Sequence, residues 1–207
     1  DVSTLENARK LLISLAKDFP VFYGLGNHES KMKIEGYPCQ SEYLEYEQSL
    51  RKAGVHILTN EKYEFQAKGT SLVINGLELP LEYYHKPTPP KLTDQAMEQL
   101  MGKPEPDAVN ILLAHSPKYG RTYFNWGADL ILMDIEMPGM NGLDAARAVL
   151  EQRPECKVIF VTAYSLFQYA HEAMHLGACD YLLKPVNPDE VEASIRKAIR
   201  QIEAGRR

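Results

Sequence analysis

The sequence predicts an α/β fold: a mainly parallel sheet with flanking helices, plus a small antiparallel hairpin region in the N-terminal half. Two short apolar runs, residues 111–114 and 128–133, have the length of buried strands, and the segment between them suits a crossover helix. Beyond them, helical and strand patterns alternate, which implies right-handed βαβ units. Each run leads into a polar side chain, His115 or Asp134, at the edge where open α/β sheets place their sites.

The N-terminal half is expected to alternate helices with short strands. Helix-capping residues and amphipathic patterns mark its helices. The expected helices are residues 3–18, 41–53 and 93–101, the expected strands are residues 21–26 and 55–58, and residues 31–40 are expected to be a loop. Residues 63–65 and 71–74 flank a turn at Lys68–Gly69 and predict the antiparallel hairpin. We expect a further turn at Asn75–Gly76 and a further strand within residues 77–84.

The C-terminal part has a more regular pattern. Its helical patterns are about ten residues or longer, and its strands are short and rich in β-branched or aromatic residues. The expected helices are residues 141–152, 166–176 and 188–204, and the expected strands are residues 157–162 and 181–183. This alternation predicts a parallel sheet whose strands end on one common edge.

Composition narrows the class of protein. Hydrophobic residues make up 44% of the chain and charged residues 25%, which is ordinary for a globular protein. The net charge of −5 gives no support for nucleic-acid binding through a basic surface. No apolar run is long enough to span a membrane, and no signal peptide is recognisable. The scattered Cys39, Cys156 and Cys179 indicate reduced thiols, so we expect a cytoplasmic protein.

Two motifs in the N-terminal half resemble those of the calcineurin-like metallophosphoesterases. Residues 26–29 read GNHE after an apolar run, and residues 114–117 read AHSP after another. The resemblance implies that Asn27 and His115 bind metal and that His28 protonates the leaving group. Two ions such as Mn²⁺, Fe²⁺ or Zn²⁺ would activate water and hold the phosphate.

This resemblance implies a partial metallophosphoesterase-like domain over residues 1–127. The place of the family's final G-H-x-H motif reads MDIEM, residues 133–137, so the implied binuclear site is incomplete. A metal-dependent phosphoesterase is therefore one alternative function for the chain.

Three separated motifs in the C-terminal half resemble the response-regulator receiver domain. They read LILMDIEMPGMNG, VIFVTAY and GACDYLLKP, in the order that this family shows. The resemblance implies a partial, flavodoxin-like receiver domain over residues 128–207. It also implies phosphorylation of Asp134 by a histidine kinase in two-component signal transduction.

The receiver resemblance assigns roles to further residues. Thr162 would be the switch hydroxyl, Lys184 the cation that pairs with the phosphoryl group, and Tyr181 the rotating aromatic side chain. Asp134 and the backbone carbonyl of Glu136 would bind Mg²⁺. A cation beside a strand-end carboxylate supports this chemistry, because it neutralises charge that develops on the phosphoryl group.

The chain departs from the receiver pattern upstream of residue 128. The family's first strand ends in two acidic residues that hold Mg²⁺, whereas here the preceding strand leads into His115 and Ser116. Few oxygen ligands then remain for an octahedral Mg²⁺ site, so we expect impaired phosphorylation. An alternative is a composite site of Asn27, His28, His115 and Asp134, whose mixed ligands favour Mn²⁺, Fe²⁺ or Zn²⁺.

Three functions therefore stay open. The first is a phosphoacceptor module, the second a metal-dependent phosphoesterase, and the third a chimeric or designed fold that has neither activity. The face formed by residues 167–176 and the last helix is where receivers dock or dimerise, so a homodimer is one expected arrangement. The two domains implied by the resemblances meet inside a strand that both families accept. They are expected to form either one continuous sheet or two tightly abutting lobes.

Overall fold

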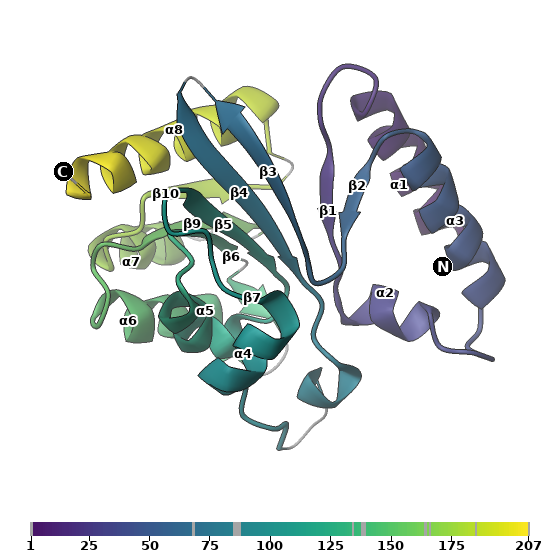
Figure 1. Ribbon diagram of the computed structural model, residues 1–207, viewed down its shortest axis with the longest axis horizontal. Helices are drawn as coiled ribbons and strands as arrows, with labels where there is room; N and C mark the ends of the chain where they lie inside the picture. Colours follow the sequence, from purple (N-terminus) through teal and green to yellow (C-terminus); the bar gives the residue numbers. More distant parts are fainter. Residues whose placement is uncertain are drawn as a thin grey trace.

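A six-stranded sheet with helices on both faces forms the larger part of the molecule (Figure 1). The computed structural model describes residues 2–67, 69–84, 88–133, 135–137, 140–163, 165, 167–184 and 186–206. The strands, in their spatial order, are β10 (Asp180–Leu183), β9 (Lys157–Thr162), β6 (Leu130–Met133), β5 (Val109–Ala114), β4 (Thr70–Leu77) and β3 (Glu61–Ala67). Among the described residues of this sheet, β3 and β4 form the only antiparallel pair. The predicted α/β fold with a mainly parallel sheet and an antiparallel hairpin is therefore confirmed.

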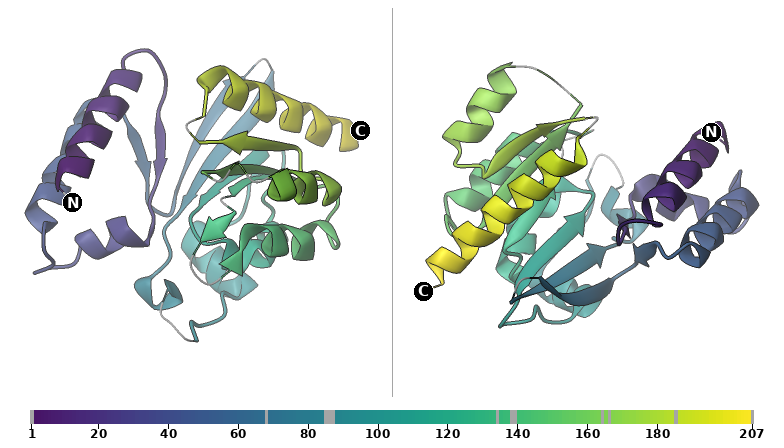
Figure 2. Two further views of the ribbon diagram at one scale, coloured as in Figure 1. Left: turned by 180° about the vertical axis from the view of Figure 1, so that it is seen from behind. Right: turned by 90° about the horizontal axis from the view of Figure 1, so that it is seen from above.

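The helices divide unequally between the two faces of this sheet. One face carries a layer of four helices: α4 (Asp94–Met101), α5 (Gly120–Trp126), α6 (Gly142–Leu150) and α7 (Phe167–His175). The other face carries α8 (Pro188–Gly205), as Figure 2 shows. Ala198 and Ile202 of this helix pack against Leu130 and Ile159. No helix in the described part of the chain is long and apolar enough to cross a bilayer.

The strand order explains this division. From β4 to β10, each parallel strand lies beside the parallel strand that precedes it in the chain. Right-handed crossovers that all step in one direction place their helices on the same face of the sheet. The chain returns to the other face only after β10, in α8. The C-terminal half, from β6 to α8, thus has the flavodoxin-like arrangement that the sequence predicts.

The first 58 residues form a smaller lobe beside the hairpin (Figure 1). Its elements are α1 (Val2–Leu15), β1 (Phe22–Gly24), α2 (Asn27–Met32), α3 (Gln40–Lys52) and β2 (His56–Leu58). β1 and β2 form a separate parallel pair, and the buried side chains of Tyr43, Tyr46 and Leu50 pack α3 against them. The lobe meets the main sheet where Leu58 of β2 touches Gly76 of β4.

Most predicted elements are present, and three local predictions are wrong. Asn75 and Gly76 belong to β4 instead of a turn, because Gly76 gives room for Leu58 to approach the strand. Residues 77–84 contain a 3₁₀ helix, Leu81–Tyr84, after Pro80 instead of a strand. The loop expected from residue 31 begins inside α2, which is only six residues long and shows no full amphipathic period.

Candidate functional site

The carboxyl ends of β9 and β10 bring two predicted site residues together. The strands are parallel, with Thr162 in register with Leu183. Lys184 directly follows β10, and its backbone N–H donates a hydrogen bond to the carbonyl oxygen of Thr162 over 2.7 Å. β6 lies on the other side of β9, with Met133 in register with Phe160, so three strands end at this edge of the sheet.

The two side chains at this edge have opposite environments. Thr162 is fully buried, and the alternation along β9 turns it, like Val158 and Phe160, toward the four-helix layer. Lys184 is exposed, so its ammonium group keeps contact with water. A hydroxyl and an ammonium group can each bind an anionic oxygen, and the backbone hydrogen bond brings the two residues that carry them to the same edge of the sheet.

The predicted phosphoacceptor, Asp134, lies outside the described residues. The positions on either side of it are buried, since Met133 is 3% exposed and Ile135 is fully buried. The chain then forms a two-stranded antiparallel ribbon of β7 (Glu136–Met137) and β8 (Met140–Asn141). The backbone of Glu136, predicted to supply a carbonyl to Mg²⁺, belongs to this ribbon.

Tyr181, the predicted switch aromatic, lies in β10 on the side of the four-helix layer. Its side chain is half-buried, and this burial raises the pKa of the phenol. The hydroxyl therefore stays protonated at neutral pH.

The GNHE and AHSP motifs lie against each other at the end of β5. A Cβ atom placed on Gly26 would lie 3.2 Å from Nδ1 of His115 and 2.9 Å from Oε2 of Glu29. The glycine therefore gives the imidazole and the carboxylate room beside the same stretch of backbone. Asn27 is half-buried and His28 is exposed, both in the first turn of α2.

Side chains that the sequence interpretation did not select hold this corner in place. Glu29 accepts hydrogen bonds from the Gly26 N–H at 3.0 Å and from the Tyr23 hydroxyl at 3.3 Å. Glu78, just past β4, accepts from Ser30 at 2.7 Å and pairs with Lys33 at 3.2 Å. Glu29 is the last residue of the GNHE motif, but the resemblance gives it no role, and Glu78 belongs to no recognised motif. Only the folded arrangement shows what these two carboxylates hold.

The residues at the end of β5 do not fit the receiver's Mg²⁺ site. Mg²⁺ prefers carboxylate and water oxygens in octahedral geometry, whereas β5 leads into an imidazole and a hydroxyl, His115 and Ser116. Within the described part of the chain, no group of three or more His, Cys, Asp or Glu side chains is placed to hold a metal ion. The predicted composite site of Asn27, His28, His115 and Asp134 includes one residue, Asp134, that lies outside the described part of the chain.

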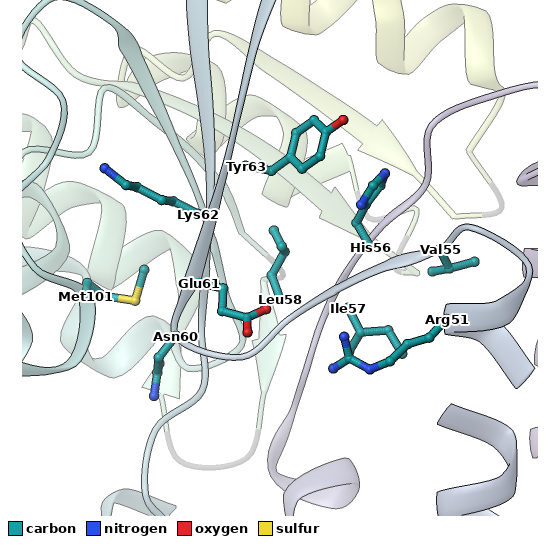
Figure 3. Close-up of a pocket in the computed structure, with 10 residues that line it drawn as sticks. All are labelled: Arg51, Val55, His56, Ile57, Leu58, Asn60, Glu61, Lys62, Tyr63 and Met101. Atoms are coloured by element: carbon teal, nitrogen blue, oxygen red, sulfur yellow. The ribbon is translucent and has the colours of Figure 1, made fainter. Parts of the chain in front are cut away.

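A separate pocket of about 580 Å³ lies between β2, α3 and the start of β3 (Figure 3). Arg51, His56 and Lys62 are the basic residues among its lining. Arg51 is paired with Glu47, and Lys62 contacts Glu64 and Glu105. These carboxylates balance the basic charge, and neither Thr162 nor Lys184 lines the pocket.

Comparison with known proteins identifies relatives of the C-terminal part. Regulatory protein LuxO of Vibrio cholerae serotype O1 is 41% identical over 73 residues, which are 35% of this chain and 16% of that protein. The uncharacterized transcriptional regulatory protein YxjL of Bacillus subtilis is 38% identical over 72 residues, 35% of this chain and 33% of that protein. The chain thus spans a small part of these relatives.

A solved structure, the response regulator receiver protein from Pseudomonas putida, is 30% identical over 44% of this chain and 75% of its own, with a TM-score of 0.38. Neither LuxO nor YxjL supports the phosphoesterase resemblance of residues 1–127. The family model of the response regulator receiver domain matches residues 92–196, from just before α4 into α8. This match takes in half of the chain, which therefore belongs to the response regulator receiver domain family.

Proposed function

We propose that this chain is a phosphoacceptor module of two-component signalling and that Asp134 is its phosphorylated residue. The observation that carries the proposal is the meeting of Thr162 and Lys184 at the edge where β6, β9 and β10 end. Asp134 directly follows the last residue of β6 in the sequence. A histidine kinase would be the donor, and the buried, unpaired thiols of Cys156 and Cys179 agree with a reducing cytoplasm.

The proposed reaction moves one phosphoryl group. A carboxylate oxygen of Asp134 forms a bond to phosphorus while the bond from phosphorus to the donor's imidazole nitrogen breaks. The imidazole leaves with the electron pair and takes up a proton, and an acyl phosphate remains on Asp134. The Lys184 ammonium neutralises charge on the phosphoryl oxygens, and the Thr162 hydroxyl donates a hydrogen bond to one of them.

The proposed reaction assigns no role to Mg²⁺, because the residues at the end of β5 do not fit the Mg²⁺ site of the receiver family. His115 stands where the family has acidic residues, and a neutral imidazole is a poor ligand for this hard cation. We therefore expect slower phosphorylation than in receivers that have the acidic pair. The phosphoesterase alternative, with Asn27, His28 and His115, has no comparable supporting observation.

The test is the intact mass of the protein after incubation with acetyl phosphate and Mg²⁺. We expect a phosphoryl adduct in the wild type and none in Asp134→Asn. Asp144→Asn is the matched control, because Asp144 is an exposed aspartate on α6, and this variant should keep the adduct. An adduct that persists in Asp134→Asn, or no adduct in the wild type, would overturn the proposal.

A further inference from the structure

Two histidines on α7 lie outside the phosphoacceptor site. His171 and His175 are four residues apart on this helix, and both side chains are exposed. Their Nε2 atoms are 3.1 Å apart, and their ring centroids are 4.3 Å apart. Residues four apart lie one above the other on the same helix face, so the backbone itself holds the two rings together.

The distance between the two nitrogens matches the edge of a metal coordination polyhedron. Ligand nitrogens bind zinc-like ions at about 2.0–2.1 Å, which separates two neighbouring ligands by about 2.9 Å at a right angle and about 3.3 Å at the tetrahedral angle. The observed 3.1 Å falls between these values. The two Nε2 atoms therefore already have the separation that two ligands of one metal ion require.

We propose that His171 and His175 form a surface chelate for a divalent transition-metal ion such as Ni²⁺, Cu²⁺ or Zn²⁺. Imidazole nitrogen suits these ions and not Mg²⁺ or Ca²⁺. Without metal, one Nε2–H donates to the other Nε2. On metal binding the donor ring changes tautomer: its Nε2 gives a proton to water, its Nδ1 takes a proton from water, and each neutral ring then binds through its Nε2 lone pair. Water fills the remaining coordination positions.

The residues around the two histidines allow metal binding but not catalysis of hydrolysis. The helix reads HEAMH from His171 to His175, a spacing that in zinc proteases adds a glutamate as general base. Here Glu172 is paired with Arg147 of α6, so its carboxylate is already engaged. No third metal-ligating side chain joins the two histidines among the residues that the structure describes. The two histidines therefore form a metal-binding site that has no hydrolytic function.

Titration of the purified protein with NiCl₂, followed by calorimetry, tests the chelate. We expect one strong site in the wild type and binding about a hundredfold weaker in His171→Ala and in His175→Ala, because each variant loses the advantage of the second, tethered ligand. MgCl₂ should give no heat that depends on these residues. Unchanged circular dichroism would show that α7 remains folded in each variant.

A double variant distinguishes binding that requires two adjacent histidines from binding that requires only two histidines anywhere on α7. Gln168→His combined with His171→Ala keeps two exposed histidines on α7 but places them seven residues apart, about 10 Å along the axis. One ion cannot bridge that distance, so we expect binding as weak as in the single variants. Gln168→Ala should bind like the wild type. Strong binding that survives in the double variant, that survives in either single variant, or that is missing from the wild type would overturn the proposal.

Discussion

The backbone N–H of Lys184 donates to the carbonyl oxygen of Thr162 over 2.7 Å, which ties the end of β10 to the end of β9. Because this bond is between backbone atoms, the position of Lys184 does not depend on its own side chain. The ammonium group can therefore be removed without disturbing the strand ends, and its chemical role can be tested separately from the fold.

Lys184→Ala should reduce the acetyl phosphate adduct at Asp134 by roughly tenfold or more, since one charge-assisted contact contributes about 1.5–3 kcal/mol. The side chain is exposed, so the free energy of unfolding should change by no more than about 0.5 kcal/mol. Adduct yield by intact mass and urea denaturation measure the two effects. A variant that is phosphorylated at the wild-type rate would remove Lys184 from the reaction.

Two phenylalanines allow a matched test of the core. Phe160 in β9 is fully buried, whereas Phe167 at the start of α7 is 80% exposed. Phe160→Ala should lower the free energy of unfolding by about 3–5 kcal/mol through lost burial and a cavity. Phe167→Ala should change it by about 0.5 kcal/mol or less. Urea denaturation followed by emission of the single tryptophan, Trp126, gives both values; equal losses would contradict the assigned burial.

Gly76 is the position where the N-terminal lobe approaches the main sheet. A Cβ atom there would lie 2.2 Å from Cβ of Leu58 and 2.7 Å from its carbonyl oxygen. The backbone of Leu58 cannot easily move away from such an atom. Gly76→Ala should therefore destabilise the protein by about 1–3 kcal/mol. Gly205→Ala, at the end of α8 with open space around it, is the control and should be neutral or slightly stabilising in thermal unfolding. A neutral Gly76→Ala would show that β2 does not pack here.

The three cysteines should react at different rates. Burial raises the pKa of Cys156 to about 12, and burial also raises the pKa of Cys179. The thiolate is the reactive form, so both residues should resist alkylation at pH 8, while the half-exposed Cys39 should be labelled. Mass spectrometry after brief iodoacetamide treatment should find one label in the native protein and three in urea. Cys39→Ser should abolish the native label.

The sequence predicts regular elements well where the apolar period is long and the ends are marked. The strand at residues 157–162 and the helix that Thr93 caps are found as predicted. The turn predicted at Asn75–Gly76 is wrong because this dipeptide occurs both in hairpin turns and where another part of the backbone packs closely against a strand. Only the position of Leu58 in the folded protein distinguishes the two cases. Short helices such as α2 give too few residues for a periodic signal.

Only part of the candidate site could be predicted from the sequence. Thr162 and Lys184 come together as strand-end residues of neighbouring parallel strands, which pattern and family resemblance both indicate. The roles of Glu29 and Glu78 were not predictable, because they depend on how α2 packs against the end of β4. The histidine pair on α7 was not predicted, because the distance between the two rings is defined only by the folded helix.

The sequential order of the strands has a consequence for how the chain folds during synthesis. From β4 onward, each new parallel strand pairs with the parallel strand made just before it, so the sheet can grow in the order of translation with few long loop closures. The face that α8 covers is completed last. Until Ala198 and Ile202 have emerged, Leu130 and Ile159 lack their helical cover, and the nascent chain carries an apolar surface that is prone to aggregation.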